Sequence, residues 1–221
     1  MGQPAIAIAC VVVALAACGA GGFGQAAGSA ASLPAIDGVV TGAEHIYRNE
    51  INGHRAYTDL AFVAGNQTLL AQLDRSELVA AQAYAQRLMT GNRTVRALHI
   101  TRISVIAGGR ALINAVWNSN GAFVVAPVTR VLRYHGRTLG TLLVSVQDVV
   151  GFVRLIGRDL GAQAVVRGSS GQVRTSLPAA ASVKLPSSGS ATIAGTHYEV
   201  GSFHLGGWGG ETLTVWVLKA P

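Results

Sequence analysis

The chain has 221 residues, of which 50% are hydrophobic and 12% are charged, and its formal net charge is +7. This length and apolar content suit one domain with a buried core and an appendage. The basic balance would suit a binder of nucleic acid, of an anionic membrane or of anionic ligands, but no run of five basic residues and no nucleic-acid motif is present, which argues against nucleic acid.

The chain begins with a dense apolar segment over residues 6–17. At about twelve residues it is too short to cross a bilayer comfortably as a helix, which needs roughly 20 residues. Small residues follow it directly, as they follow the apolar core of a secretory signal peptide, although no Lys or Arg precedes it.

Both cysteines lie in this opening segment, Cys10 within the apolar run and Cys18 at its end. Residues 15–19, with the sequence LAACG, resemble the lipobox of bacterial lipoproteins, in which the signal is cut before a cysteine that carries a diacylglycerol group. The resemblance implies a signal peptide over residues 1–17 and lipidation of Cys18, which leaves the mature domain without a thiol. Two alternatives are a plain secretory signal cut nearer Gln25 and a disulfide between the two cysteines.

Residues 18–35, which begin with Cys18, are otherwise mostly Gly, Ala and Ser, a composition that cannot bury a core and predicts a flexible tether. Acyl chains partition into membranes at about 0.8 kcal/mol per buried CH₂. We therefore expect the domain to be held at the extracytoplasmic face of a membrane, or to be secreted or periplasmic if Cys18 is not lipidated.

Two helices are predicted next. Apolar residues recur at spacings of three and four from Ile36 to Tyr57, which indicates one face of an amphipathic helix. A second helix is predicted over residues 67–89 and is ended by Gly91.

The apolar period then changes to two, which indicates strands. Hairpin signals stand between the strands as Gly-Gly at 108–109, Asn-Gly at 120–121 and His-Gly at 135–136. Four strands are predicted near residues 95–106, 110–118, 122–134 and 138–147.

The last third of the chain is predicted to hold one helix and more strands. Residues 148–161 have helical apolar spacing, with Asp148 placed as the N-cap. A strand pair (162–168 and 171–176), a loop (177–190) and two closing strands (191–205 and 211–220) are predicted to follow. Without an alternating βαβ series, this order predicts an α+β fold with an antiparallel sheet and a short crossing helix.

Residues 124–156 resemble the core of the extracytoplasmic Cache (PAS-like) sensor domains, which have a long N-terminal helix and a curved antiparallel sheet. The matching features are a Pro-led segment, a Gly turn, a Gly-led apolar strand and an acidic residue that opens a short helix. They occur in that order as Pro127, Gly136, Gly140, the segment LLVSV and Asp148. Residues 165–176 are similar to the next hairpin of the family.

The likeness covers most of residues 36–221 and implies a single Cache-like domain there. Such a domain is expected to bind a small molecule, for which an anion is one candidate, and to pass its occupancy to a partner protein. The amino-acid-binding version of the family has an Arg-x-Trp-Tyr run ahead of the matched segment. This chain has NAVWNSNGAF at residues 114–123 instead, so the resemblance does not imply an amino-acid ligand.

The resemblance also implies a ligand pocket on the sheet face, and five residues are candidates for it. Trp117 and Tyr134 are expected as aromatic walls, Arg130 or Arg133 as a carboxylate clamp, and Asp148 as an acceptor. The two arginines have opposite parity in a regular strand, so at most one of them should face the pocket. The structural alternatives are a core tryptophan, arginines on a solvated strand face, and an aspartate that only caps a helix.

The sequence points to no enzyme, cofactor or metal. The six histidines lack the close spacing of zinc motifs, and G-x-S-x-G and H-E-x-x-H signatures are absent. The Gly-rich segment at 206–210 is predicted to be a hairpin turn rather than a phosphate loop. The rivals to a sensor are an envelope lipoprotein that acts in structure or protein interaction without a ligand, and an envelope enzyme.

Overall fold

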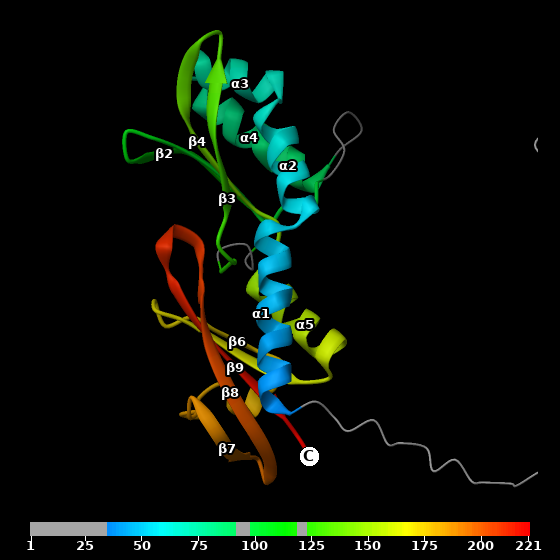
Figure 1. Cartoon of the computed structure of the whole chain (residues 1–221). Coiled ribbons are helices and arrows are strands. Elements are labelled where there is room, and N and C mark those ends of the chain that lie inside the picture. Colours follow the sequence, from blue (N-terminus) through cyan, green and yellow to red (C-terminus); the bar gives the residue numbers. More distant parts are fainter. Residues whose placement is uncertain (1–34, 92–97, 119–122) are drawn as a thin grey trace, which may run out of the picture. The chain divides into compact units, whose positions relative to one another are not determined.

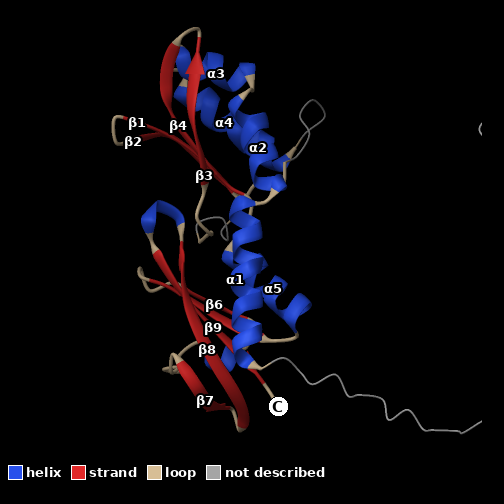
Figure 2. Cartoon of the chain, viewed as in Figure 1, coloured by secondary structure: helices blue, strands red, loops and turns tan. Residues whose placement is uncertain are grey.

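The computed structural model describes residues 35–91, 98–118 and 123–221, which form helices and two separate antiparallel sheets (Figures 1 and 2). The predicted α+β class is therefore confirmed, but the single predicted sheet is corrected to two sheets, of four and five strands. The predicted signal peptide, Cys18 and the tether as far as residue 34 lie outside the described residues.

Each of the two predicted N-terminal helices is divided in two. Helix α1 (Ile36–Asn52) ends at Gly53, whose extended backbone (φ −77°, ψ 162°) separates it from α2 (His54–Ala64). A Cβ atom at residue 53 would collide with the carbonyl oxygen of Asn49, so glycine is what permits this break. Helices α3 (Gln67–Asp74) and α4 (Leu78–Thr90) are likewise separated at Ser76, which has a left-handed φ of 59°.

The four-stranded sheet has the order β2-β1-β4-β3. Its predicted hairpin turns at Gly108-Gly109 and His135-Gly136 are confirmed, since all four residues have positive φ. The Asn-Gly turn predicted at 120–121 lies outside the described residues. Helices α2, α3 and α4 pack on one face of this sheet through buried apolar side chains. The strands are β1 (Arg102–Ala107), β2 (Arg110–Val116), β3 (Val128–Tyr134) and β4 (Arg137–Ser145).

The five-stranded sheet has the order β6-β5-β9-β8-β7. Helix α1 and helix α5 (Val149–Leu160) cover one face, where Tyr47 meets Phe152 edge to face at 6.2 Å. The segment around the short 3₁₀ helix η2 (Pro178–Ala180) covers the other face. The strands are β5 (Gln163–Gly168), β6 (Val173–Thr175), β7 (Ser188–Ile193), β8 (Thr196–Gly206) and β9 (Thr212–Lys219).

The prediction of two closing strands was wrong, because the first of them is a hairpin. Ala194 and Gly195 both have positive φ (49° and 81°) and turn the chain between β7 and β8. The turn predicted at residues 206–210 is confirmed, and it contains the short 3₁₀ helix η3 (Trp208–Gly210) between β8 and β9.

We call α2–α4 with β1–β4 (residues 54–146) the four-stranded lobe, and α1 with α5 and β5–β9 (residues 36–52 and 147–221) the five-stranded lobe. The segment between β2 and β3 joins them. Its Val124 forms a β-bridge with Asp148 and its Val125 forms one with Gly207, so this piece of chain between two strands of one lobe is built into the other.

Gly140 in β4 provides a test of the sheet's packing. Its φ is +149°, and a Cβ atom there would lie 2.6 Å from the carbonyl oxygen of Ile106. Gly140→Ala is therefore expected to lower the free energy of unfolding by about 2–3 kcal/mol in urea titrations. Gly109→Ala is the control, because it has positive φ but no atom within 4 Å, and it should cost about 1 kcal/mol. Equal losses of stability in the two variants would contradict the close approach of β4 to β1 at Gly140.

Candidate functional site

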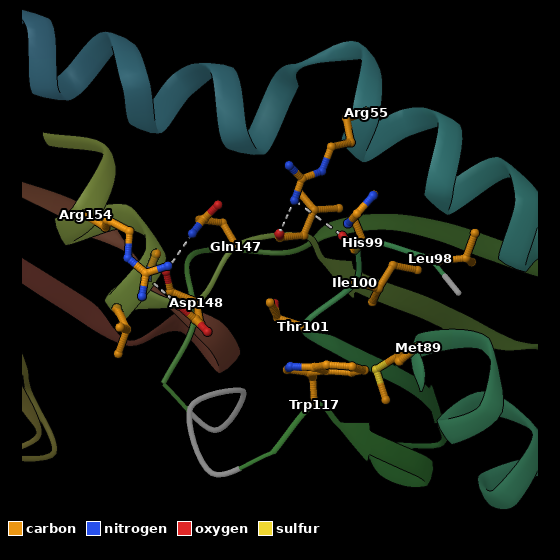
Figure 3. A pocket seen from close by; sticks show the side chains of 13 residues that line it. Arg55, Met89, Leu98, His99, Ile100, Thr101, Trp117, Gln147, Asp148 and Arg154 are labelled. Carbon is orange, nitrogen blue, oxygen red and sulfur yellow. Dashed lines mark hydrogen bonds between the residues drawn. The ribbon is translucent and has the colours of Figure 1, made fainter. Parts of the chain in front are cut away.

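A cavity of about 480 Å³ opens where five segments of the chain meet (Figure 3). These segments are the start of α2, the end of α4, the residues before β1, the residue after β2, and the connection from β4 into the first half of α5. Each segment brings a different chemical group to the cavity. The lining side chains that carry polar or aromatic groups are Arg55, His99, Thr101, Trp117, Gln147, Asp148 and Arg154.

Arg55 holds two of these segments together. Its Nη2 atom donates to the carbonyl oxygen of Val146 at 2.7 Å and to that of His99 at 3.5 Å (Figure 3). A guanidinium group has five N–H donors, and within the described residues no hydrogen bond is found for Nε or Nη1 of Arg55. The side chain therefore supports the cavity wall and still has donors for a ligand.

Asp148 lies at the junction of β4 and α5. It caps the helix as predicted, because its Oδ1 atom accepts a hydrogen bond of 2.5 Å from the Gly151 amide. The preceding Gln147 donates from its Nε2 atom to the Asp148 carbonyl oxygen at 3.2 Å. Asp148 and Gln147 are both half-buried at the cavity, where they offer oxygen acceptors beside the N-terminus of α5.

Arg154 comes from α5 and is exposed. Among the residues that the structure describes, it has neither a hydrogen bond nor an ion pair, and Figure 3 shows its guanidinium group beside Asp148 at one end of the cavity. Two arginines and the positive end of a helix dipole thus face one carboxylate. This balance of charge favours a ligand with an anionic group.

Trp117 supplies an aromatic wall. It follows β2, its amide donates to the Thr101 carbonyl oxygen at 2.8 Å, and its side chain is 38% exposed. Figure 3 shows the Met89 side chain beside the indole ring. Because Met89 packs beside the indole ring and part of the ring remains exposed at the cavity, the flat or apolar part of a ligand can stack on it.

Glu50 lies near this charge arrangement without lining the cavity. It is in the last turn of α1, and burial raises the pKa of its carboxyl group above the ordinary value of 4.5. The positive charges of Arg55 and Arg158 act in the opposite direction on this pKa. Burial is the larger effect, so the ionised form of Glu50 is disfavoured in the folded protein.

The structure brings two of the five candidate residues together. Trp117 and Asp148 line the cavity. Tyr134 packs against the core of the four-stranded lobe and meets His135 edge to face at 4.1 Å. Arg130 and Arg133 lie at a separate cleft of about 310 Å³.

Both arginines line that cleft in spite of their opposite parity. The pairing of β3 with β4 shifts register between Leu132 and Arg133, so that Leu132 faces Gly140 and Arg133 faces Thr138. The extra residue of this bulge is Leu139 in β4, and β3 itself still alternates there, because Leu132 and Tyr134 pack on the core while Arg133 is exposed. The cleft lies along the edge of β3 and takes side chains of both parities, since the consecutive residues Arg130 and Val131 also line it.

The cavity residues that sequence reasoning missed are Arg55, His99, Gln147 and Arg154. They come from segments that are far apart in the chain, and each stands alone without a motif. Arg154 had the best signal, because it is a cation within the otherwise apolar first half of the helix predicted at 148–161.

Two features are absent from residues 35–91, 98–118 and 123–221, the part of the chain that the structure describes. No group of three or more His, Cys, Asp or Glu side chains in these ranges is placed to hold a metal ion. No helix in them is long and apolar enough to cross a membrane.

No known family model matches the chain, and no curated protein matches its sequence. The periplasmic domain of Vibrio cholerae LuxQ is similar in structure, with 12% identity, 84% of this chain and 96% of that chain covered, and a TM-score of 0.46. The ligand-binding domain of the Pseudomonas fluorescens chemoreceptor CtaA, in complex with L-alanine, has 9% identity, coverage of 84% and 97%, and a TM-score of 0.40. The ligand-binding domain of the Pseudomonas aeruginosa amino acid chemoreceptor PctC, in complex with GABA, is 14% identical to this chain. The match covers 83% of this chain and 97% of that chain, with a TM-score of 0.32.

The raised pKa of Glu50 predicts a pH-dependent stability. The folded state binds the proton more readily than the unfolded state, so stability falls as the pH rises from 4.5 through the folded pKa. Glu50→Gln is therefore expected to have a higher melting temperature than the wild type at neutral pH. The difference should disappear below pH 4.5, where both states of the wild type are protonated. A variant less stable at neutral pH would show that the attraction to Arg55 and Arg158 outweighs burial.

Proposed function

We propose that the protein is an extracytoplasmic ligand-binding or sensor module of Cache type whose ligand is a small molecule with an anionic group. The observation that carries this proposal is the pair of arginines, Arg55 and Arg154, that reach one cavity from separate helices with donors to spare. A guanidinium group matches the geometry of a carboxylate with two parallel hydrogen bonds.

The other groups in the cavity limit the rest of the ligand. Asp148 and Gln147 supply acceptors for a donor group, and Trp117 supplies a face for an apolar or flat part. Most small-molecule sites have a volume of about 300–1,000 Å³, and the cavity of about 480 Å³ falls in this range. A small carboxylate with a short apolar or amino-bearing portion fits these groups in both size and chemistry.

The proposal is tested by thermal shift with small carboxylates, amino acids and purines. A ligand that binds only the folded state at about 100 times its Kd stabilises by about 2.7 kcal/mol, a rise of roughly 5–10 °C in a chain of this size. We expect a dose-dependent rise that is lost in Arg154→Ala and in Trp117→Ala. Both side chains are exposed enough for the variants to fold.

Arg130→Ala is the matched control, because it removes the same group from the other cleft. It should keep the full shift. A shift that is lost equally in Arg130→Ala and Arg154→Ala would place the ligand elsewhere. If no carboxylate produces a shift, the favoured reading becomes an envelope protein that acts through protein contacts alone.

We further propose that Cys18 carries lipid and anchors the module at the membrane. The support is the LAACG sequence at residues 15–19, at the end of an apolar run near the N-terminus. A diacyl chain and the Gly-, Ala- and Ser-rich tether would keep the domain beside the membrane while allowing it to reach a partner protein.

Intact-mass measurement of the chain recovered from a lipoprotein-processing bacterial host tests the anchor. The mature chain should begin at Cys18 with the added mass of a diacylglycerol group, and Cys18→Ala should remain without it. Cys10→Ala should process normally, because that residue leaves with the signal peptide. A product that begins near Gln25 without lipid would establish the plain secretory signal instead.

A further inference from the structure

The net charge of the protein is confined to one stretch of the sequence. Residues 54–147 hold ten arginines and three acidic residues, a formal charge of +7, whereas the rest of the chain holds seven basic and seven acidic residues. Two of the ten arginines lie outside the described residues, so the described part of the four-stranded lobe holds eight arginines and three acidic residues, a formal charge of +5. A field of this kind favours negatively charged partners.

Most acidic groups of this lobe already bind arginines. Asp74 forms an ion pair of 2.8 Å with Arg137, and Glu77 forms one of 2.7 Å with Arg75. The arginines at the separate cleft differ from these, because no hydrogen bond or ion pair links Arg130 or Arg133 to any described residue. Among the residues that the structure describes, these two cations, three positions apart in β3, have no ion-pair partner.

These arginines stand on an open sheet edge. Strand β3 is the last strand of the four-stranded sheet and pairs only with β4, as Figure 1 also shows. Within the described residues, no backbone hydrogen bond is made along its other side. Val131, in the middle of the strand, is 52% exposed. A free edge of this kind can accept another strand.

Space for a strand lies next to this edge. The cleft of about 310 Å³ runs between β3 and the end of α2, where the chain has Ala61, Ala64 and Gly65. Small side chains at these positions leave the strand edge uncovered. Arg130 and Arg133 both line this cleft, so both would flank an added strand.

We propose that the β3 edge is a docking surface for an extended acidic segment of a partner protein, which adds as a fifth strand beside β3. Backbone hydrogen bonds to the free edge would supply affinity, and carboxylates of the segment would pair with Arg130 and Arg133. A second copy of this chain does not suit the edge, because β3 edges placed together would oppose arginine to arginine. This surface is separate from the cavity and does not depend on the ligand proposed for it.

The test uses the full chain and two labelled ten-residue peptides that alternate Val or Thr with either Glu or Lys. We expect fluorescence polarisation to show binding of the Glu peptide and none of the Lys peptide. The double variant Arg130→Glu, Arg133→Glu should lower the affinity for the Glu peptide at least tenfold, and it should bind the Lys peptide. Amide exchange in β3 should slow at least tenfold in the complex, because a paired edge is protected from water.

Arg87→Glu with Arg110→Glu is the matched control. It changes the net charge of the same lobe by the same amount, away from β3, and should leave the affinity for the Glu peptide within threefold. Arg154→Ala should also leave it unchanged, which separates this proposal from the cavity. Circular dichroism shows whether each variant is folded.

Three results would overturn the proposal. One is the absence of Glu-peptide binding at millimolar concentration. Another is an equal loss in the two double variants, together with equal binding of a single-stranded DNA oligonucleotide, which would indicate a general polyanion surface. The third is peptide binding without any slowing of exchange in β3.

Discussion

The arrangement of this protein depends on how the backbone polar groups of residues 145–148 are satisfied where the chain leaves β4 for α5. Buried amide and carbonyl groups must find partners, and here those partners come from distant parts of the chain. Arg55 donates to the Val146 carbonyl, the Val125 amide donates to the Gln147 carbonyl, and the Asp148 carboxylate caps α5. This single junction therefore orients α5, holds the β2–β3 segment in the five-stranded lobe and shapes the cavity wall.

The same junction explains why the cavity is polar on one side. At the start of α5 the Val149 amide donates to the Phe123 carbonyl oxygen and the Gly151 amide to the Asp148 carboxylate, so the polar side of the cavity comes from the side chains of Asp148 and Gln147. Arg55 serves both structure and site, since one nitrogen supports the wall and the others remain available. Arg154 is exposed and has no hydrogen bond or ion pair among the described residues, so replacing it tests the proposed ligand site without removing a structural contact.

Charge separates the two surfaces that we propose to be functional. The cavity combines cations with a carboxylate, an arrangement suited to a small molecule with an anionic and a donor group. The β3 edge has two arginines and a row of free backbone groups without an acid, an arrangement suited to an acidic strand. Because the two surfaces share no residue, ligand binding and partner docking could be changed independently by substitution.

The sequence by itself determined the α+β class, the helix cap at Asp148 and the glycine turns at 108–109 and 135–136, because these depend on local spacing and on conformations open to few residues. The predicted lipid anchor at Cys18 also depends on sequence alone. Only the tertiary structure decided that the strands form two sheets, since strand pairing joins residues far apart in the chain. It also decided that Trp117 and Asp148 share a cavity with Arg55 and Arg154, while Arg130 and Arg133 line a separate cleft at the edge of β3. Periodicity cannot show which strand lies at an edge or where distant segments meet, because both arise from packing rather than from local preference.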